Sequence, residues 1–289
     1  MSNAIVMVVG SLHYDIIVEA DHLPRMDETA IGTRWYPKFG GKGGNQAVSA
    51  IKQGAAARMV GAVGDDSFGH FLREKLRAAG VDDRFVRLAP GVGSGMSVAL
   101  LDANGDYAAT IVSGANLQID VAALAAPALW KDIGLLILQN EVPEAVNRAA
   151  ATEARARGLP VLLNAAPFRP LPADLLANVT HLIVNAVEAE GLGTPPVTSL
   201  AAASAAARQL SPLAANVIAT AGAQGLAAAS GQETVSVPAE NVRTVSSHGA
   251  GDAFIGALAA ALLRGATLHV AAQTAARAAA RHVAGLPAT

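Results

Sequence analysis

The stretch Ile5-Val6-Met7-Val8-Val9-Gly10 decides the fold class. A short, largely β-branched run that ends at a glycine is typical of a parallel strand buried on both faces. Similar apolar runs recur at residues 57–63, 135–138, 161–164, 181–185 and 216–219. Longer segments of helical character separate them, at residues 44–54, 69–79, 142–157 and 199–210. This alternation predicts one α/β domain: a mostly parallel sheet with helices on both faces, and an active site at the carboxyl ends of the strands.

Two stretches, 15–39 and 94–112, interrupt the alternation of strands and helices. The first alternates in places, as in Ala30-Ile31-Gly32-Thr33-Arg34-Trp35-Tyr36. The second predicts a hairpin with strands at 96–101 and 107–112, because its turn Asp102-Ala103-Asn104-Gly105 contains Asn-Gly. We expect both stretches to form one small antiparallel sheet that serves as a lid over the active site, as a dimer surface, or as both. Residues 253–263 and 268–284 predict alanine-rich helices that pack the core.

The composition narrows the class of protein. The 289 residues are 52% apolar and 15% charged, which suits a large buried core and argues against disorder. The formal net charge is −2 without a basic patch, so nucleic acid is not an expected partner. The absence of cysteine excludes disulfides and thiolate metal sites. Neither a signal peptide nor a membrane-spanning stretch is apparent, so we expect a cytoplasmic protein without a membrane partner.

The first chemical motif is Gly40-Gly41-Lys42-Gly43-Gly44-Asn45-Gln46-Ala47, which directly precedes a predicted helix. Four glycines allow the backbone to approach a ligand closely and to adopt positive φ angles. The helix start offers free N–H groups, and Lys42 and Asn45 can donate hydrogen bonds to hydroxyls. The same segment can also be a tight strand-to-helix turn. It is not a Walker motif, because no Ser or Thr follows Lys42 at the required place.

The second motif is Gly249-Ala250-Gly251-Asp252-Ala253-Phe254, at another loop-to-helix junction. Small side chains leave the backbone N–H groups bare at a helix N-terminus, where they can stabilise the charge of a transferring phosphoryl group. Asp252 can take a proton from an attacking hydroxyl, or it can simply cap the helix. These residues alone leave both interpretations open.

Two further motifs follow predicted strands. Asn185-Ala186-Val187-Glu188 offers an amide and a carboxylate that can order water around Mg²⁺, or that can merely begin a helix. Thr220-Ala221-Gly222-Ala223-Gln224-Gly225 contains glycines that leave room for nucleotide phosphates, although many loops of this kind look alike.

Taken together and in order, these segments resemble the ribokinase or PfkB-type carbohydrate kinase family. The resemblance extends from about Val8 to about Ala280, nearly the whole chain. It implies a three-layer α/β/α core with a β lid, and an ATP-dependent kinase that acts on a sugar hydroxyl. It also implies a homodimer formed through the lid.

The resemblance also assigns residues. It implies a substrate site made of His13, Asp15, Gly41, Lys42, Gly43, Asn45 and Glu141. It implies an ATP site made of Asn185, Thr220, Gly222, Ala223, Gly225 and Gly251. It implies that Glu188, through water, and Asn185 organise Mg²⁺. It assigns the anion hole to Gly249, Ala250 and Gly251, and the catalytic base to Asp252, which also contacts the substrate.

Three positions depart from the family pattern. The pattern places Asn where His13 stands, so the sugar pocket is altered, although an imidazole can still bond the same hydroxyl. Ser246-Ser247 replaces an Asp-Thr pair whose carboxylate helps to bind a monovalent cation, so we expect weak or absent K⁺ activation. His248 stands where a small or apolar residue is usual; it can be structural, or it can aid phosphate binding.

The substrate remains open between a ribose-like pentose and a nucleoside or another hydroxyl compound. Base stacking on Tyr14, Trp35, Tyr36 or Phe39 would favour a nucleoside. A sugar-binding protein without activity is a third alternative. The presence of Asp252, Asn185 and Glu188 argues against it, because sugar binding alone does not need a base or a metal position.

Overall fold

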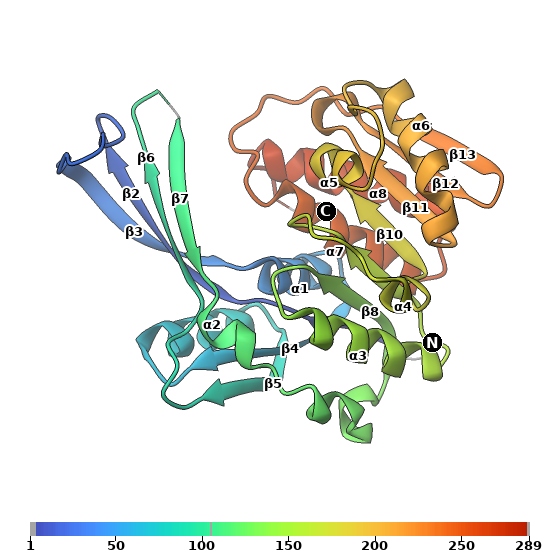
Figure 1. Cartoon of the computed structure of the whole chain (residues 1–289), viewed down its shortest axis with the longest axis horizontal. Coiled ribbons are helices and arrows are strands. Elements are labelled where there is room, and N and C mark those ends of the chain that lie inside the picture. Colours follow the sequence, from blue (N-terminus) through green and yellow to red (C-terminus); the bar gives the residue numbers. More distant parts are fainter. Residues whose placement is uncertain (1–3, 105, 288–289) are drawn as a thin grey trace.

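The computed structural model describes residues 4–104 and 106–287. Its centre is a nine-stranded sheet in the order β13-β12-β11-β10-β9-β8-β1-β4-β5 (Figure 1). The parallel strands are β1 (Ile5–Val9), β4 (Ala56–Gly64), β5 (Asp82–Ala89), β8 (Ile133–Gln139), β9 (Val161–Asn164), β10 (His181–Val184) and β11 (Asn216–Thr220). The strands β12 (Leu226–Ser230) and β13 (Glu233–Val237) add an antiparallel edge. The mostly parallel sheet predicted from the sequence is confirmed.

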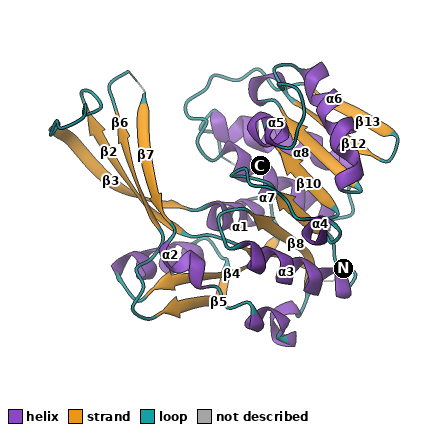
Figure 2. Cartoon of the chain, viewed as in Figure 1, coloured by secondary structure: helices purple, strands orange, loops and turns teal. Residues whose placement is uncertain are grey.

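Helices cover both faces of this sheet (Figure 2). One face carries α1 (Lys42–Lys52), α2 (Ser67–Ala78), α7 (Ala250–Leu263) and α8 (Leu268–Val283). The other carries α3 (Glu144–Ala156), α4 (Ala173–Leu176), α5 (Ala186–Gly191) and α6 (Leu200–Leu210). Short 3₁₀ turns occupy Gly114–Gln118, Ala122–Ala125, Pro127–Trp130, Ser211–Leu213 and Gly222–Gln224.

Strand β1 shows why two cores form. Its side chains alternate between the faces, so Val6 and Val8 join the core beneath α1 and α7, while Met7 and Val9 join the opposite core. All four are fully buried. An uninterrupted apolar strand therefore requires helices on both sides, which gives the three-layer arrangement expected from the resemblance.

Helix α7 packs closely against α1 and brings the two glycine motifs together. A Cβ at Gly256 would lie 2.4 Å from Ser49 Oγ, so only glycine permits this approach. Ser49 Oγ also donates to the Ala253 carbonyl at 3.0 Å. Because the two helices contact each other near their first turns, residues 45–46 face residue 252 although more than 200 positions separate them.

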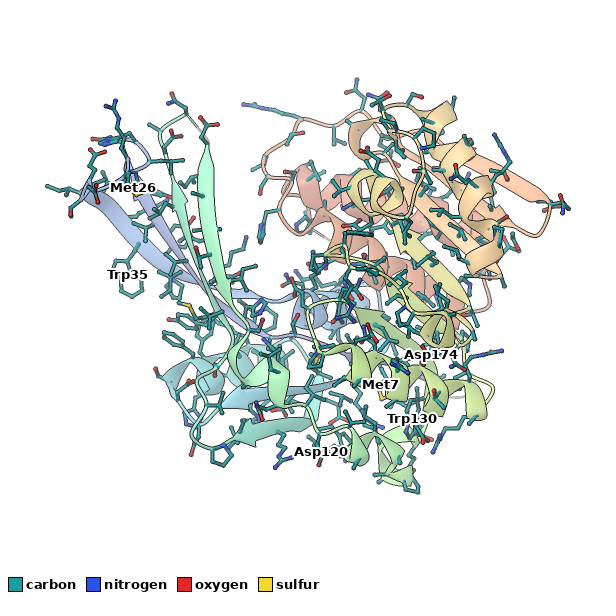
Figure 3. All side chains as sticks on the ribbon, viewed as in Figure 1. Met7, Met26, Trp35, Asp120, Trp130 and Asp174 are labelled. Atoms are coloured by element: carbon teal, nitrogen blue, oxygen red, sulfur yellow. The ribbon has the colours of Figure 1, made fainter. Side chains whose placement is uncertain are left out.

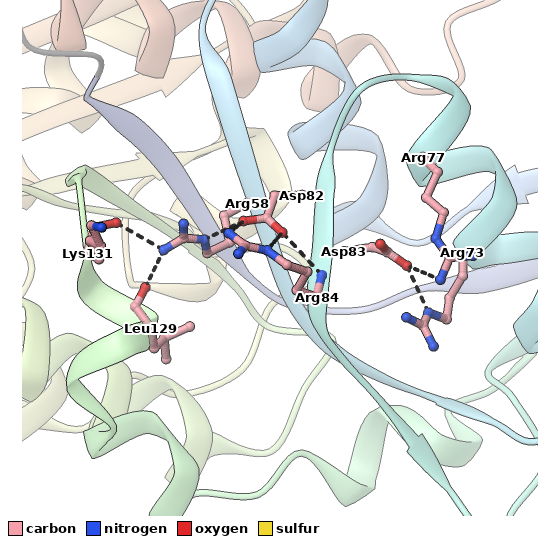
Figure 4. Close-up of polar contacts among 8 residues, drawn as sticks. All are labelled: Arg58, Arg73, Arg77, Asp82, Asp83, Arg84, Leu129 and Lys131. Carbon is pink, nitrogen blue, oxygen red and sulfur yellow. Dashed lines mark hydrogen bonds and ion pairs between the residues drawn. The ribbon is translucent and has the colours of Figure 1, made fainter.

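An ion-pair network stabilises the N-terminal end of β4 (Figure 4). The buried Arg58 donates to Asp82 at 2.8 Å and to the Leu129 and Lys131 carbonyls at 2.7 and 3.0 Å. Arg84 also donates to Asp82, and the two guanidinium groups hold the pKa of that carboxyl well below its ordinary value, with Arg84 the larger cause. The network ties β4, β5 and the segment before β8 into one unit.

A second sheet of four strands projects from the core in the order β3-β2-β6-β7, as Figure 2 shows. Its strands are β2 (His13–Ala20), β3 (Gly32–Gly40), β6 (Met96–Leu101) and β7 (Tyr107–Val112). The predicted hairpin is present, but Gly105 of its turn lies outside the described residues. The prediction of a purely antiparallel sheet is wrong, because β2 and β6 pair in parallel. The chain passes through the core between them and re-enters in the same direction.

Candidate active site

Asp252 lies in the first turn of α7, next to the glycine motif that precedes α1. Its side chain is buried, at 8% exposure, and both carboxylate oxygens accept hydrogen bonds. Gln46 Nε2 donates to Oδ1 at 3.0 Å, and Asn45 Nδ2 donates to Oδ2 at 3.1 Å. The N-cap of α7 is Gly249, and no side chain caps the helix, so Asp252 does not serve as its N-cap.

Burial raises the pKa of the Asp252 carboxyl to about 6, because desolvation penalises the charged form. The charge of Lys42 and the two amide hydrogen bonds oppose this rise, while nearby Glu141 adds to it. A carboxylate with a pKa close to neutrality is well matched to accepting a proton from a hydroxyl.

The loop before α1 approaches the end of β1 closely. Gly41 has φ +86°, and a Cβ there would lie 2.7 Å from the His13 backbone nitrogen. Glu141, which follows β8, accepts from the Lys42 backbone N–H at 2.8 Å and from the Ser11 hydroxyl. Glu141 therefore anchors the N-terminus of α1, a contact that the sequence did not predict.

Asp15 and His13 lie on β2, where the second sheet meets the core. Asp15 is buried and accepts from Ser97 of β6, and desolvation raises its pKa despite that hydrogen bond. His13 is 3% exposed, and its Nε2 has no hydrogen-bond partner among the described residues. Its Nδ1 lies 3.9 Å from Glu141 Oε2, too far for a hydrogen bond. The predicted substrate residues His13 and Asp15 therefore lie close to Glu141 and the loop before α1, and neither nitrogen of the imidazole makes a hydrogen bond to the described residues.

The start of α7 presents unpaired backbone N–H groups. Gly249 is left-handed, with φ +81°, and Ala250 donates to the Ser247 carbonyl at 3.2 Å. Within 4–104 and 106–287, the N–H groups of Gly249 and Gly251 have no protein acceptor. The arrangement suits an anion, because the N–H groups and the helix dipole act in the same direction. Ala250 of the expected anion hole is already engaged in the turn.

A cavity of about 150 Å³ reaches Asp252 from the surface. Its lining includes Lys38, Asn45, His248, Gly249 and His282. Desolvation, and after it the charge of Lys38, lowers the pKa of the His248 imidazole. Its backbone carbonyl accepts from His282 Nε2 at 2.8 Å.

Asn185 and Glu188 form a capping box at the start of α5. The Asn185 side chain accepts from the Glu188 N–H at 3.1 Å, and Glu188 Oε2 accepts from the Asn185 N–H at 2.7 Å. Asn185, through Oδ1, and Glu188, through Oε2, therefore act as helix-start residues, as the helix-start interpretation predicts. Glu188 Oε1 makes no hydrogen bond to the described residues and stays available.

The loop after β11 lies beside this capping box, because β10 and β11 are neighbouring parallel strands. Thr220 Oγ1 lies 3.4 Å from the Val184 carbonyl. Gly222 and Gly225 have positive φ angles, and Ala223 is exposed between them. The five predicted nucleotide residues outside α7 thus lie at the carboxyl ends of adjacent strands, where a ligand of an open α/β sheet binds.

Among the described residues, no three His, Asp or Glu side chains gather as a metal site. The chain does offer the single carboxylate Glu188 beside the loop of Thr220. Mg²⁺ commonly takes one or two carboxylates, several waters and substrate phosphates. These residues therefore fit an ion that arrives with nucleotide phosphates and touches Glu188 directly or through water, rather than an ion held by protein alone.

Gln46 is a candidate site residue that the sequence did not identify. It is fully buried, and its amide is one of the two donors to Asp252. Its place directly after Asn45, in a glycine motif, is the one local signal. Ser97 and His282 were missed as well, because each contacts its partner across a long separation in sequence.

Known proteins similar to this chain share its length and fold. Residues 3–285 match the family described as pfkB family carbohydrate kinase. A ribokinase of Bacillus subtilis (strain 168) is 35% identical over 275 residues, which cover 95% of this chain and 91% of that protein. A deoxyribokinase of Salmonella typhi is 34% identical over 258 residues, which cover 88% and 84%. The structure of Arabidopsis thaliana ribokinase complexed with ribose and ATP matches with a TM-score of 0.89 at 29% identity, and covers 98% of this chain and 93% of that one. The chain therefore belongs to the pfkB family of carbohydrate kinases.

Proposed function

We propose that this ATP-dependent sugar kinase phosphorylates a hydroxyl of a ribose-like pentose, with Asp252 as the general base. One observation carries the proposal: a buried carboxylate with a pKa of about 6 lies between the substrate loop and a helix N-terminus with free N–H groups. Two of the similar proteins are ribokinases and one is a deoxyribokinase, which favours a pentose.

The proposed mechanism follows from the contacts of Asp252. Oδ1 is held by Gln46, while Oδ2 is held by Asn45, which also belongs to the substrate loop. When Asn45 turns to a sugar hydroxyl, Oδ2 becomes free to accept the proton of the attacking hydroxyl. The N–H groups of Gly249 and Gly251 receive the charge of the transferring phosphoryl group. Glu188 and Asn185 would hold a Mg²⁺ ion that arrives with ATP, and such an ion would supply charge neutralisation for the phosphates.

The remaining substrate residues bind and orient the sugar. Asp15, held by Ser97, and Lys42 and Gly43 of the loop offer acceptors and donors for hydroxyls. The unused Nε2 of His13 can bond a hydroxyl in place of the family's asparagine amide. Thr220, Gly222, Ala223 and Gly225 contact the nucleotide in this proposal, at the edge where Asn185 lies.

A nucleoside is the second candidate, and the aromatic side chains do not favour it. Tyr14 is already stacked on Phe68, with ring centroids 4.0 Å apart. Phe39 packs against the core, and Arg34 lies over the ring of Tyr36. Trp35 points to the face of the second sheet opposite Asp15, because strand side chains alternate. Of the four rings suggested by the sequence, only Tyr36 shares the face of Asp15, and the Arg34 guanidinium lies over it.

We also propose that the second sheet is a lid and the surface of a homodimer. The face that carries Asp15 turns to the active site. The opposite face carries a contiguous apolar set: Ile16, Val18, Trp35, Val98 and Leu100. Trp35 is 64% exposed, and Figure 3 shows it on the projecting sheet. An apolar sheet face of this kind is typical of a surface that another protein chain covers.

Monovalent cations are expected to have little effect on the reaction. Ser246 and Ser247 offer no carboxylate beside the turn, and Ser246 Oγ already accepts from the His248 N–H at 3.3 Å. As for the location in the cell, the described ranges contain no helix that is long and apolar enough to cross a membrane. A cytoplasmic location remains our expectation from the sequence.

An ATP-consumption screen tests the substrate assignment. Purified protein is incubated with Mg-ATP and, separately, with ribose, deoxyribose, fructose, other sugars and nucleosides, and ADP release is measured. The proposal expects the highest kcat/KM with ribose or deoxyribose. A nucleoside with a higher kcat/KM than every sugar would replace the pentose by the second candidate.

A further inference from the structure

The turn that carries the free N–H groups is tied to the end of α8. The backbone N–H groups of Val245 and Ser246 donate to the Val283 carbonyl at 2.8 and 3.2 Å. His248 follows these two residues in the chain, and its carbonyl oxygen lies 2.8 Å from His282 Nε2. The last turn of α8 therefore holds the segment before α7 at both ends, and the contact at His248 is made by a side chain.

The chemistry of this contact fixes the role of the ring. A carbonyl oxygen can only accept, so His282 Nε2 carries a hydrogen and donates it. The contact does not depend on the charge of the ring, because Nε2 keeps its hydrogen in the imidazolium and in the neutral tautomer that the carbonyl selects. The neutral ring with its hydrogen on Nε2 therefore makes the same hydrogen bond as the protonated ring.

The contact also sets the direction of the Gly249 N–H. The peptide that joins His248 to Gly249 is trans, so its C=O and N–H point to opposite sides. With the carbonyl held on α8, the Gly249 N–H points away from α8. Gly249 has φ +81°, a conformation that glycine adopts without strain and can also leave easily. No described residue accepts from this N–H, so the hydrogen bond from His282 to the His248 carbonyl is what opposes rotation of the peptide.

We propose that His282 is a positioning residue for phosphoryl transfer: it holds the His248–Gly249 peptide so that the Gly249 N–H faces the transferring group. This inference rests on the proposed function, in which that N–H belongs to the anion hole. His282 lines the cavity that reaches Asp252, but its one hydrogen bond among the described residues goes to the His248 carbonyl and not to Asp252. It acts through the backbone carbonyl, and a Cβ at Gly249 would lie 3.2 Å from its Nε2, so glycine is also required for the close contact.

Four proteins test the inference: wild type, His282→Ala, His282→Gln and Arg277→Ala. The His282 ring is exposed, so its loss leaves the melting temperature unchanged, which is checked first. We expect kcat of His282→Ala to fall by about fivefold with an unchanged KM for the sugar, the effect of one lost donor near the transition state. His282→Gln, whose amide nitrogen reaches the same place, retains kcat. Arg277→Ala is the matched control, since Arg277 is an exposed cation of α8 that does not line the cavity beside Asp252.

Two results would overturn the inference: His282→Ala with the kcat of wild type, or His282→Gln as slow as His282→Ala. Asp252→Asn is assayed in the same series. An active wild type with an inactive Asp252→Asn upholds the proposed function even where the His282 variants overturn this inference. If the wild-type protein phosphorylates no sugar and no nucleoside, the proposed function itself is contradicted.

Discussion

Gln46 Nε2 lies 3.0 Å from Asp252 Oδ1, and Gln46 is fully buried. Oδ1 accepts from the buried Gln46, which stays in place, and Oδ2 accepts from Asn45 of the substrate loop, which a substrate can displace in the proposed mechanism. The proposed base therefore keeps its orientation when the sugar displaces Asn45.

The pH dependence of the rate follows from the Asp252 carboxyl, whose pKa burial raises to about 6. The base must be deprotonated, so kcat/KM should fall about tenfold for each pH unit below 6 and level off above it. The measurement is initial rate against pH at saturating Mg-ATP. A rate that stays constant down to pH 4.5 would contradict a base with a raised pKa.

Gln46→Met should move this acid limb. The amide hydrogen bond lowers the pKa of Asp252, so its loss raises that pKa further, by about one unit for a bond to a charged group. The midpoint of the pH–rate profile should move upward by a similar amount. Ser49→Ala is the control, because Ser49 joins α1 to the Ala253 carbonyl and not to the carboxylate. An unmoved midpoint in Gln46→Met would show that the amide does not tune the base.

Trp35→Glu should convert the proposed homodimer into a monomer. A charge placed on the apolar face of the second sheet would be buried without a partner in the dimer, a cost of several kcal/mol. Sedimentation velocity at equal concentrations measures the change. Arg34→Ala is the matched control on the opposite face, where Arg34 pairs with Glu19. If wild type sediments as a monomer, the dimer proposal fails.

Exchange of Na⁺ for K⁺ at constant ionic strength should change kcat less than about twofold, because Ser246 and Ser247 supply no charged oxygen ligand. Initial rates in the two chloride salts, with Tris as the buffer cation, give the comparison. A several-fold rise in K⁺ would mean that backbone and hydroxyl oxygens alone suffice to bind the ion.

The sequence predicted what depends on local pattern. The apolar run of β1 indicated the parallel sheet, and Asn-Gly indicated the β6–β7 hairpin. The edge strands β5 and β13 and the neighbouring strand β12 were missed: β5 is rich in charge, and β12 is mostly alanine, so neither of these two has the pattern of a buried strand.

Contacts between distant segments could not be predicted in the same way. Gln46 and Asp252 are 206 positions apart, and only the packing of α1 on α7 brings them together. The capping box of Asn185 and Glu188 is local and was among the alternatives. The contact of His282 with the His248 carbonyl has no sequence signal, since it depends on where α8 ends relative to the turn.

The most direct test of the proposed mechanism is ribose-dependent ADP formation by Asp252→Asn. Asparagine keeps the size of the side chain but cannot take a proton. We expect turnover to fall by about 10²- to 10⁴-fold relative to wild type, while ribose binding, measured by calorimetry, changes little. An Asp252→Asn protein that retains most of the wild-type turnover would contradict the assignment of Asp252 as the base.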